Sequence, residues 1–230
     1  MRGSGYRAGA RAVLPLLVGV IPFGVVAGAI AIDNGLSPGV AIASSIVVFA
    51  GASQVAMYDV LGDGGSAFVA ALAAWTINAR LLLYSASIAP HVSDAPLRKR
   101  LLAGYLLSDQ AYIVAMARYA AIPEAEDRIE VAIGAGATLW ISWLASTIVG
   151  ALIGSSLPAD APVEAIAPIV FLVLLLPVLD RRPAMVAAAV GGTVALFAAD
   201  AGAGGLTTVF GAAAGVVAGA LVDRDTNEIT

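Results

Sequence analysis

The chain has 230 residues, of which 60% are hydrophobic and only 12% are charged, about half the charged fraction of a soluble domain. Its formal net charge is −4 and its basic residues are scattered, which argues against a nucleic-acid-binding protein. The absence of cysteine excludes disulfides and thiolate metal sites, and the single histidine argues against a histidine-cluster metal site or a Ser-His-Asp triad. We therefore expect no cofactor and no metal.

Apolar stretches of membrane-spanning length recur along the chain, which is typical of an all-α polytopic membrane protein. We expect about eight transmembrane helices, seven being possible, with broken or kinked helices near the membrane midplane. Residues 1–230 are expected to form one transmembrane domain, with an N-terminal tail at 1–11 and a polar C-terminal tail at 223–230. The eight predicted spans cover residues 12–32, 39–61, 66–90, 101–117, 131–153, 163–179, 184–199 and 206–222.

The basic residues predict the orientation of these spans. Arg2, Arg7 and Arg11 place the N-terminus in the cytoplasm of a cell-membrane protein by the positive-inside rule. Eight spans then put most other arginines inside as well, but they leave the basic trio at residues 98–100 outside. A re-entrant segment, or a split at Asn78, would change the number of spans.

Small residues and prolines stand out in the first two predicted spans. Pro22 predicts a kink, and Gly24 with Gly28 forms a GxxxG step that lets a neighbouring helix approach closely. The second span carries Phe-Ala-Gly-Ala-Ser-Gln at residues 49–54. This segment is interpreted as a packing face, a substrate face or both, and its glutamine needs hydrogen-bond partners at membrane depth.

The third predicted span is apolar except for Asn78 and Arg80. An arginine near the midplane costs about 2.5–3.5 kcal/mol on insertion scales, so an ion path, a ligand or a fixed internal partner is expected there. On a regular helix the two side chains point about 200° apart. Either they serve two different surfaces, or the helix is broken between them and both turn inward, as in many transporters. Tyr84 lies one turn after Arg80 on the same face.

Asp109 is the second ionisable residue that the predicted spans place near the midplane. One interpretation is a structural ion pair with Arg80 that locks the third and fourth helices. Another is a site in which Arg80 attracts a carboxylate while Asp109 attracts an ammonium group or carries a coupling proton. The two are compatible, because an ion pair in an empty site can open to admit a zwitterion.

Three segments of the first half resemble the AzlC family of branched-chain amino acid exporters. They are Pro-Phe-Gly at residues 22–24, Phe-Ala-Gly-Ala-Ser-Gln at 49–54 and Asn-Ala-Arg-Leu-Leu-Leu-Tyr-Ser at 78–85. Leu-Ser-Asp-Gln at residues 107–110 is similar to the family's acidic motif, except that Gln110 stands where a second acid is expected. The resemblance covers about residues 10–112.

The resemblance implies a permease that exports valine, leucine and isoleucine across the cytoplasmic membrane and works with a small AzlD-like membrane partner. No ATP-binding motif of the GxxxxGKS kind is present, so we expect proton motive force as the driver and no enzymatic activity. Asp109 is the expected proton-coupling residue. The residues expected to bind substrate are Pro22, Phe23, Gly24, Gly51, Ser53, Gln54, Asn78, Arg80 and Tyr84. The alternatives are an intramembrane enzyme, either a lipid transferase or a protease with Ser53 as nucleophile, and a membrane scaffold subunit without transport activity.

Overall fold

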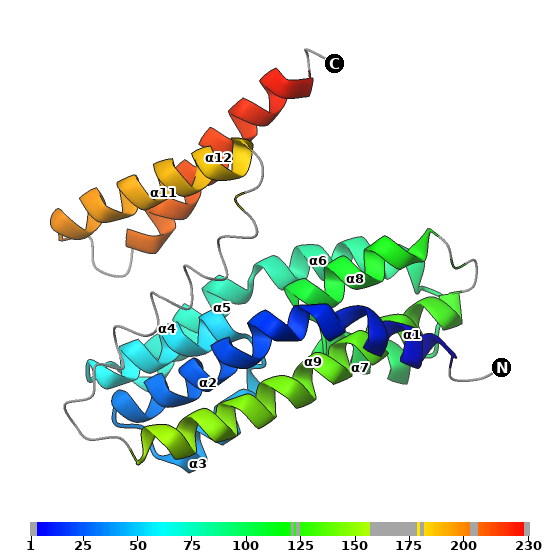
Figure 1. Cartoon of the computed structure of the whole chain (residues 1–230), viewed down its shortest axis with the longest axis horizontal. Helices are drawn as coiled ribbons and strands as arrows, with labels where there is room; N and C mark the ends of the chain where they lie inside the picture. Colours follow the sequence, from blue (N-terminus) through cyan, green and yellow to red (C-terminus); the bar gives the residue numbers. More distant parts are fainter. Residues whose placement is uncertain are drawn as a thin grey trace. The chain divides into compact units, whose positions relative to one another are not determined.

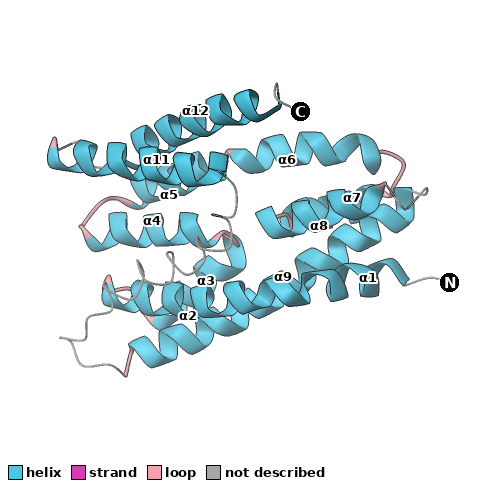
Figure 2. Ribbon diagram, turned by 45° about the horizontal axis from the view of Figure 1, so that its top comes forward, coloured by secondary structure: helices cyan, strands magenta, loops and turns pink. Residues whose placement is uncertain are grey.

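The computed structural model describes most of the chain, and every regular element in the described part is a helix (Figures 1 and 2). The described residues are 4–120, 122, 125–156, 179, 182–202 and 207–227. The chain forms two compact units, Met1–Val170 and Phe171–Thr230. The all-helical class predicted from the sequence is confirmed, whereas the predicted sixth span lies outside the described residues except for its last residue, Leu179.

Unit 1 is built on a frame of two long, parallel helical stretches that lie side by side (Figure 1). The first comprises α1 (Ser4–Val13), the short 3-10 helix η1 (Leu14–Leu16) and α2 (Leu17–Asp33), and the second is α9 (Ala125–Gly154). The segment expected to be an N-terminal tail is therefore helical from Ser4 onward. Its Gly5 and Gly9 are buried against α9.

Glycines allow the backbones of this frame to touch. A methyl group added at Gly28 would overlap the Thr147 carbonyl oxygen, and one added at Gly150 would overlap the Val25 carbonyl oxygen. Side chains at these positions would force the helices apart, and close backbone contact is what holds helices together in lipid. The packing role predicted for Gly24 and Gly28 is confirmed.

The second predicted span is not one membrane-crossing helix. It consists of α3 (Pro38–Val47) and α4 (Gly51–Gly62), which fold back on each other as hairpin 1. Asn34, just before α3, donates from Nδ2 to Asp59 Oδ1 near the end of α4 at 3.4 Å, so α4 returns to the end where α3 began. Phe49, in the turn, has a φ of +35°, a backbone conformation that is strained for any residue but glycine.

The third predicted span is broken at a single residue. Helix α5 (Ala67–Asn78) and helix α6 (Arg80–Ile88), with the 3-10 helix η2 (Ala89–His91), are bent by 43° at Ala79. The structure therefore contains the break that the sequence left open as one of two alternatives.

The fourth predicted span is also a hairpin. Helices α7 (Leu97–Tyr105) and α8 (Asp109–Tyr119) form hairpin 2, which enters from the end of unit 1 opposite to hairpin 1. Near the start of α7, Lys99 Nζ lies 3.0 Å from Glu130 Oε1 in the first turns of α9. At the end of α8, the Tyr119 ring lies 5.5 Å from the His91 ring, so α8 returns to the end where α7 began.

The tips of both hairpins lie beside the middle of α9. Trp143 of α9 donates from Nε1 to Gln54 Oε1 in hairpin 1 at 2.9 Å. Three residues earlier, Trp140 Nε1 donates to the Tyr105 hydroxyl of hairpin 2 at 3.0 Å. Two half-length hairpins thus enter from opposite ends and meet where the third predicted span is broken.

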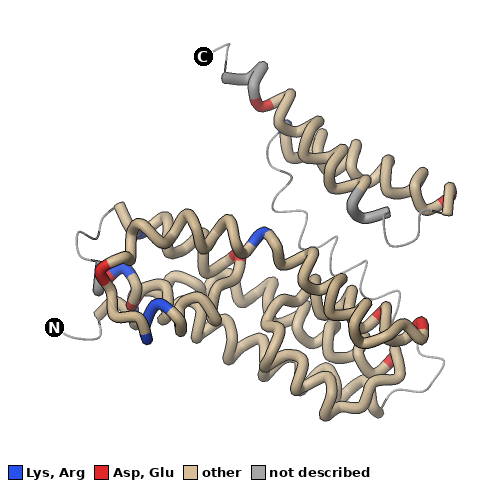
Figure 3. The backbone as a smooth tube through the Cα atoms, turned by 180° about the vertical axis from the view of Figure 1, so that it is seen from behind, with Lys and Arg blue, Asp and Glu red and all other residues tan. Residues whose placement is uncertain are grey.

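This arrangement corrects the predicted location of the basic trio at residues 98–100. Hairpin 2 brings Lys99 to within 5.8 Å of the Tyr6 ring, at the end of unit 1 that holds the N-terminus. Figure 3 shows lysine and arginine gathered at this end and only acidic residues at the opposite end of the described part of unit 1. The trio and the N-terminus therefore lie on one side, not on two.

The predicted count of eight transmembrane helices is not confirmed by the described residues. Among the described residues, three helices are long and apolar enough to cross a membrane: Ser4–Asp33, Asp127–Gly154 and Arg182–Asp200. The bent pair formed by α5 and α6 would be a fourth. Each helix of the two hairpins is too short to cross a membrane by itself. The predicted spans at residues 39–61 and 101–117 are therefore not single membrane-crossing helices.

Unit 2 is a helical pair, α11 (Arg182–Asp200) and α12 (Thr207–Asn227). The small-residue ridge Gly211, Gly215 and Gly219 is buried, and methyl groups added along it would meet Ala195, Gly191 and Ala187 of α11. The ridge is therefore used for packing within the chain. Helix α12 continues to Asn227, so most of the predicted C-terminal tail is helical.

Replacement of a frame glycine should destabilise the protein. In Gly150→Ala the new methyl group meets the Val25 carbonyl and pushes α2 away from α9, which we expect to cost about 1–3 kcal/mol. Gly104→Ala on α7 is the matched control, because nothing lies within 4 Å of its added carbon and alanine favours helix. Melting temperatures in detergent should fall for Gly150→Ala and hold or rise for Gly104→Ala; equal melting would contradict the close packing.

Hairpin 1 can be tested with single cysteines, because the chain contains none of its own. The three positions chosen are Asp33, Asp63 and Asp94, all exposed; the first ends α2, the second follows α4 and the third lies between η2 and α7. A membrane-impermeant maleimide should label positions 33 and 63 from one side of the membrane and position 94 from the other. Eight continuous spans predict instead that 33 and 94 share a side and 63 lies on the other, so that pattern of labelling would refute hairpin 1.

Candidate site: a charged pair where two hairpins meet

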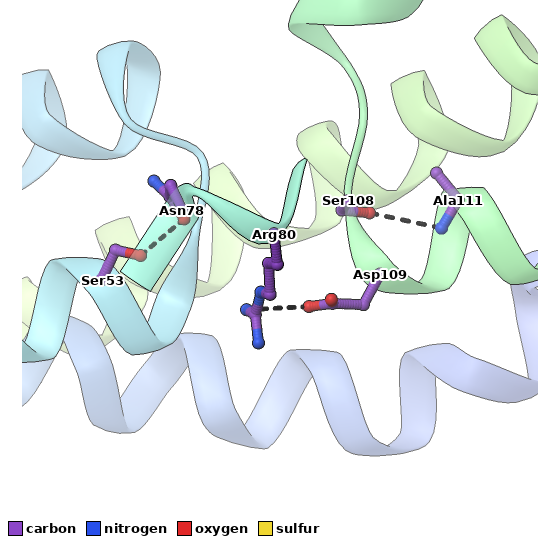
Figure 4. A network of polar contacts seen from close by, with 6 residues as sticks. All are labelled: Ser53, Asn78, Arg80, Ser108, Asp109 and Ala111. Carbon is purple, nitrogen blue, oxygen red and sulfur yellow. Dashed lines mark hydrogen bonds and ion pairs between the residues drawn. The ribbon is translucent and has the colours of Figure 1, made fainter. Parts of the chain in front are cut away.

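The break at Ala79 directs its two polar neighbours to different hairpins (Figure 4). The Ser53 hydroxyl of hairpin 1 donates to Asn78 Oδ1 at 2.6 Å. Arg80 Nη2 lies 3.0 Å from Asp109 Oδ2 of hairpin 2. The helix is therefore broken, as in one predicted alternative, while the two side chains serve two different partners, as in the other.

Both hairpin residues occupy the first turn of a half-length helix. Helix α8 begins with Asp109, and Ser108 caps it by accepting from the Ala111 backbone N–H at 3.3 Å. A carboxylate at this position interacts favourably with the positive end of the helix dipole as well as with Arg80. Helix α4 begins after Ala50, where no side chain caps it, and Ser53 lies in that first turn. The starts of two helices thus flank the broken span.

The ion pair is not sealed inside unit 1. The Arg80 side chain is 42% exposed and the Asp109 side chain 35% exposed. A polar ligand could therefore reach the pair without displacing a packed core. In a hydrocarbon environment the two charges still need each other, because either one alone is expensive at membrane depth.

Tyr84 of α6 lies beside this pair, as its spacing from Arg80 predicted. Its hydroxyl interacts with the Asp109 carboxylate. Its ring stacks on Tyr112 of α8, with centroids 4.4 Å apart and planes 12° apart. The Tyr112 hydroxyl in turn shares a hydrogen bond with the Ser87 hydroxyl at 3.1 Å. The aromatic pair therefore holds α6 against α8 next to the charges.

Gln54 has a different environment. It is fully buried, its Nε2 donates to the Ser45 hydroxyl at 2.8 Å and to the Tyr58 hydroxyl at 2.9 Å, and its Oε1 accepts from Trp143. Both amide hydrogens and the carbonyl oxygen are used inside the protein. Gln54 thus joins the two halves of hairpin 1 to α9, which favours the packing interpretation of this segment.

The glycines and aromatics predicted near the substrate also lie around Trp143 in unit 1. A methyl group added at Gly51 would lie 2.6 Å from both Phe23 and Trp143, and the Phe23 and Trp143 rings meet edge-to-face at 5.4 Å. Gly24 packs against Ser146 of α9. Pro22 is exposed and lies inside the continuous helix α2.

The predicted site residues therefore divide into two groups. Ser53, Asn78, Arg80, Tyr84 and Asp109 surround the break at Ala79, whereas the others pack around Trp143 or are exposed. Sequence reasoning missed Trp143, which lies 89 residues from Gln54 and gives no local signal. Tyr58, four residues after Gln54 on the same helix face, could have been inferred from spacing.

Long apolar helices with two half-length hairpins meeting at an ion pair define an α-helical membrane protein. Residues 15–157 match the family model described as AzlC protein, and the chain belongs to this family. It is 28% identical to the inner membrane protein YgaZ of Escherichia coli (strain K12) over 222 residues, which are 94% of this chain and 88% of that protein. It is 30% identical to an uncharacterized membrane protein of Archaeoglobus fulgidus over 195 residues, 83% of each chain. No solved structure matches it.

Replacing Gln54 by leucine should reduce stability, because the indole N–H of Trp143 and two buried hydroxyls lose their common partner. We expect a loss of about 2–3 kcal/mol, or roughly 5 °C or more in melting temperature. Gln110→Leu, at a partly exposed position of α8, is the control and should change melting little. Unchanged melting of Gln54→Leu together with lost substrate binding would show that Gln54 contacts the ligand and does not serve packing.

Proposed function

We propose that the protein is a secondary transporter that exports branched-chain amino acids, namely valine, leucine and isoleucine, across the cytoplasmic membrane. Proton motive force drives it, and it acts as the large subunit of a permease with a small AzlD-like partner. The observation that supports this proposal most directly is the Arg80–Asp109 pair, which lies at a helix break between two opposed hairpins. Broken helices at membrane depth are how many transporters build a substrate site.

The chemistry of the pair suits a zwitterion. Arg80, together with backbone N–H groups at the uncapped start of α4, holds the substrate carboxylate. Asp109 holds the substrate ammonium or carries the coupling proton, and Tyr84 lies against both charges. In the empty site the two side chains neutralise each other. In the loaded site the substrate carboxylate takes the place of Asp109 beside Arg80, and the substrate ammonium group takes the place of Arg80 beside Asp109.

The surroundings of Ser53 argue against the alternative of a serine hydrolase. Its side chain is fully buried, and its hydroxyl donates to the Asn78 amide oxygen. A nucleophilic serine needs a base as the acceptor of its proton, and an amide oxygen is not one.

The charge distribution favours a cytoplasmic N-terminus. Hairpin 2 places the basic trio at the N-terminal end of unit 1, and the acidic Asp33, Asp59 and Asp63 mark the opposite end. An excess of arginine and lysine on one side is the usual mark of the cytoplasmic side.

The proposal is tested by counterflow of labelled leucine or valine into vesicles that hold the purified chain, with and without its small partner. We expect uptake that increases with the partner and falls at least tenfold in Arg80→Ala, because the carboxylate loses its charged ligand. Arg98→Ala, an exposed arginine on α7, is the matched control and should transport like the parent.

Three outcomes are informative. Uptake by the chain alone would make the partner regulatory. Normal uptake by Arg80→Ala would remove the pair from the substrate site. Absence of uptake of any branched-chain amino acid by a verified, folded complex would contradict the proposed substrate class.

A further inference from the structure

One tyrosine forms a hydrogen bond between the two hairpins. The Tyr105 hydroxyl, in the last turn of α7, donates to the Ile46 backbone carbonyl in the last turn of α3. The same hydroxyl accepts from Trp140 Nε1 of α9 at 3.0 Å, and the Tyr105 and Trp140 rings lie 6.5 Å apart. A single oxygen atom therefore joins the tip of hairpin 1, the tip of hairpin 2 and the frame.

Tyr105 satisfies a backbone group that the fold of hairpin 1 has left open. In a continuous helix the Ile46 carbonyl would accept from the N–H of residue 50, but α3 ends at Val47 and α4 starts at Gly51. At membrane depth no bulk water replaces the missing donor. The broken end of hairpin 1 is thus completed by a side chain of hairpin 2.

Tyr105 is also closely connected to the charged pair. Only the tip residues 106–108 separate it from Asp109, and two of them, Leu106 and Leu107, are buried at 5% and 8% exposure. A shift of the Tyr105 end of the tip must therefore move the start of α8. On the other side of the break, Ser53 and Asn78 join hairpin 1 to the same span that carries Arg80.

We propose that Tyr105 is a positioning residue that couples the two hairpins and thereby sets Asp109 relative to Arg80, without touching the substrate. The contacts form a closed circuit from Asp109 through Arg80 to Asn78, from Asn78 through Ser53 into hairpin 1, and from Ile46 through Tyr105 back to the tip that carries Asp109. Movement of one hairpin is passed to the other through this circuit. Its consequence for transport rests on the function proposed above.

The test is a distance measurement between the hairpins in the full chain. Spin labels are placed at Val47→Cys on hairpin 1 and Leu101→Cys on hairpin 2, which are 75% and 65% exposed, in a chain free of other cysteines. Pulsed electron paramagnetic resonance in lipid nanodiscs should give one narrow distance distribution for the parent. Tyr105→Phe should show a second, longer-distance population increased about fivefold over the parent, the factor expected for loss of one ordinary hydrogen bond.

Two further variants make the result specific. Trp140→Phe removes the bond that fixes the same hydroxyl to α9 and should shift the distribution in the same direction, so the proposal stays testable if Tyr105→Phe folds poorly. Tyr58→Phe is the matched control, because that hydroxyl bonds to Ser44 and Gln54 within hairpin 1 and its loss should leave the distance unchanged. A folded Tyr105→Phe or Trp140→Phe protein with the parent's distribution would overturn the proposal.

Leucine counterflow by the same variants separates this inference from the proposed function. We expect Tyr105→Phe to raise the apparent KM for leucine and to shift the pH dependence of transport, since Asp109 is no longer held in place, whereas Tyr58→Phe should change neither. A changed distance distribution with no leucine transport by any variant or by the parent would support the coupling and refute the substrate. Normal distances with normal transport in Tyr105→Phe would refute the coupling alone.

Discussion

The helix break at Ala79 is the constraint on which the rest of unit 1 depends. Asn78 and Arg80 would point about 200° apart on a continuous helix, and in hydrocarbon each polar group must find a partner within the protein. The 43° bend lets Asn78 meet hairpin 1 and Arg80 meet hairpin 2. The break and the two hairpins therefore belong together, because each hairpin tip supplies the polar partner of one residue beside the break.

The frame formed by α2 and α9 makes this arrangement possible. In lipid there is little hydrophobic gain from bringing two helices together, so van der Waals contact and hydrogen bonds have to hold them. Gly28 and Gly150 allow the backbones to touch, and the frame then offers fixed polar groups to the hairpins. Trp143 fixes hairpin 1 through Gln54, while Glu130 fixes the entry of hairpin 2 through Lys99.

The polar residues within apolar stretches could be interpreted correctly from the sequence. Arg80 and Asp109 pair, as the cost of a lone charge in hydrocarbon requires, and the alternatives for Asn78 included the break that is found. Their roles in substrate binding stay a prediction. The partners of Gln54 could not be predicted in full, because Trp143 comes from a helix far along the chain and packing against α9 depends on the three-dimensional fold.

The hairpins escaped prediction because hydropathy measures apolar length, and two half-length helices have the same apolar length as one span. Two features of the sequence nevertheless carried the information. Ser108 followed by Asp109 is a helix-start signal inside an apolar stretch, where a continuous span has no reason to start a helix. The basic trio at residues 98–100 violates the positive-inside rule if residues 39–61 cross the membrane, and it satisfies the rule once they fold back as hairpin 1. Charge therefore reports on which side a loop lies, which apolar length alone cannot do.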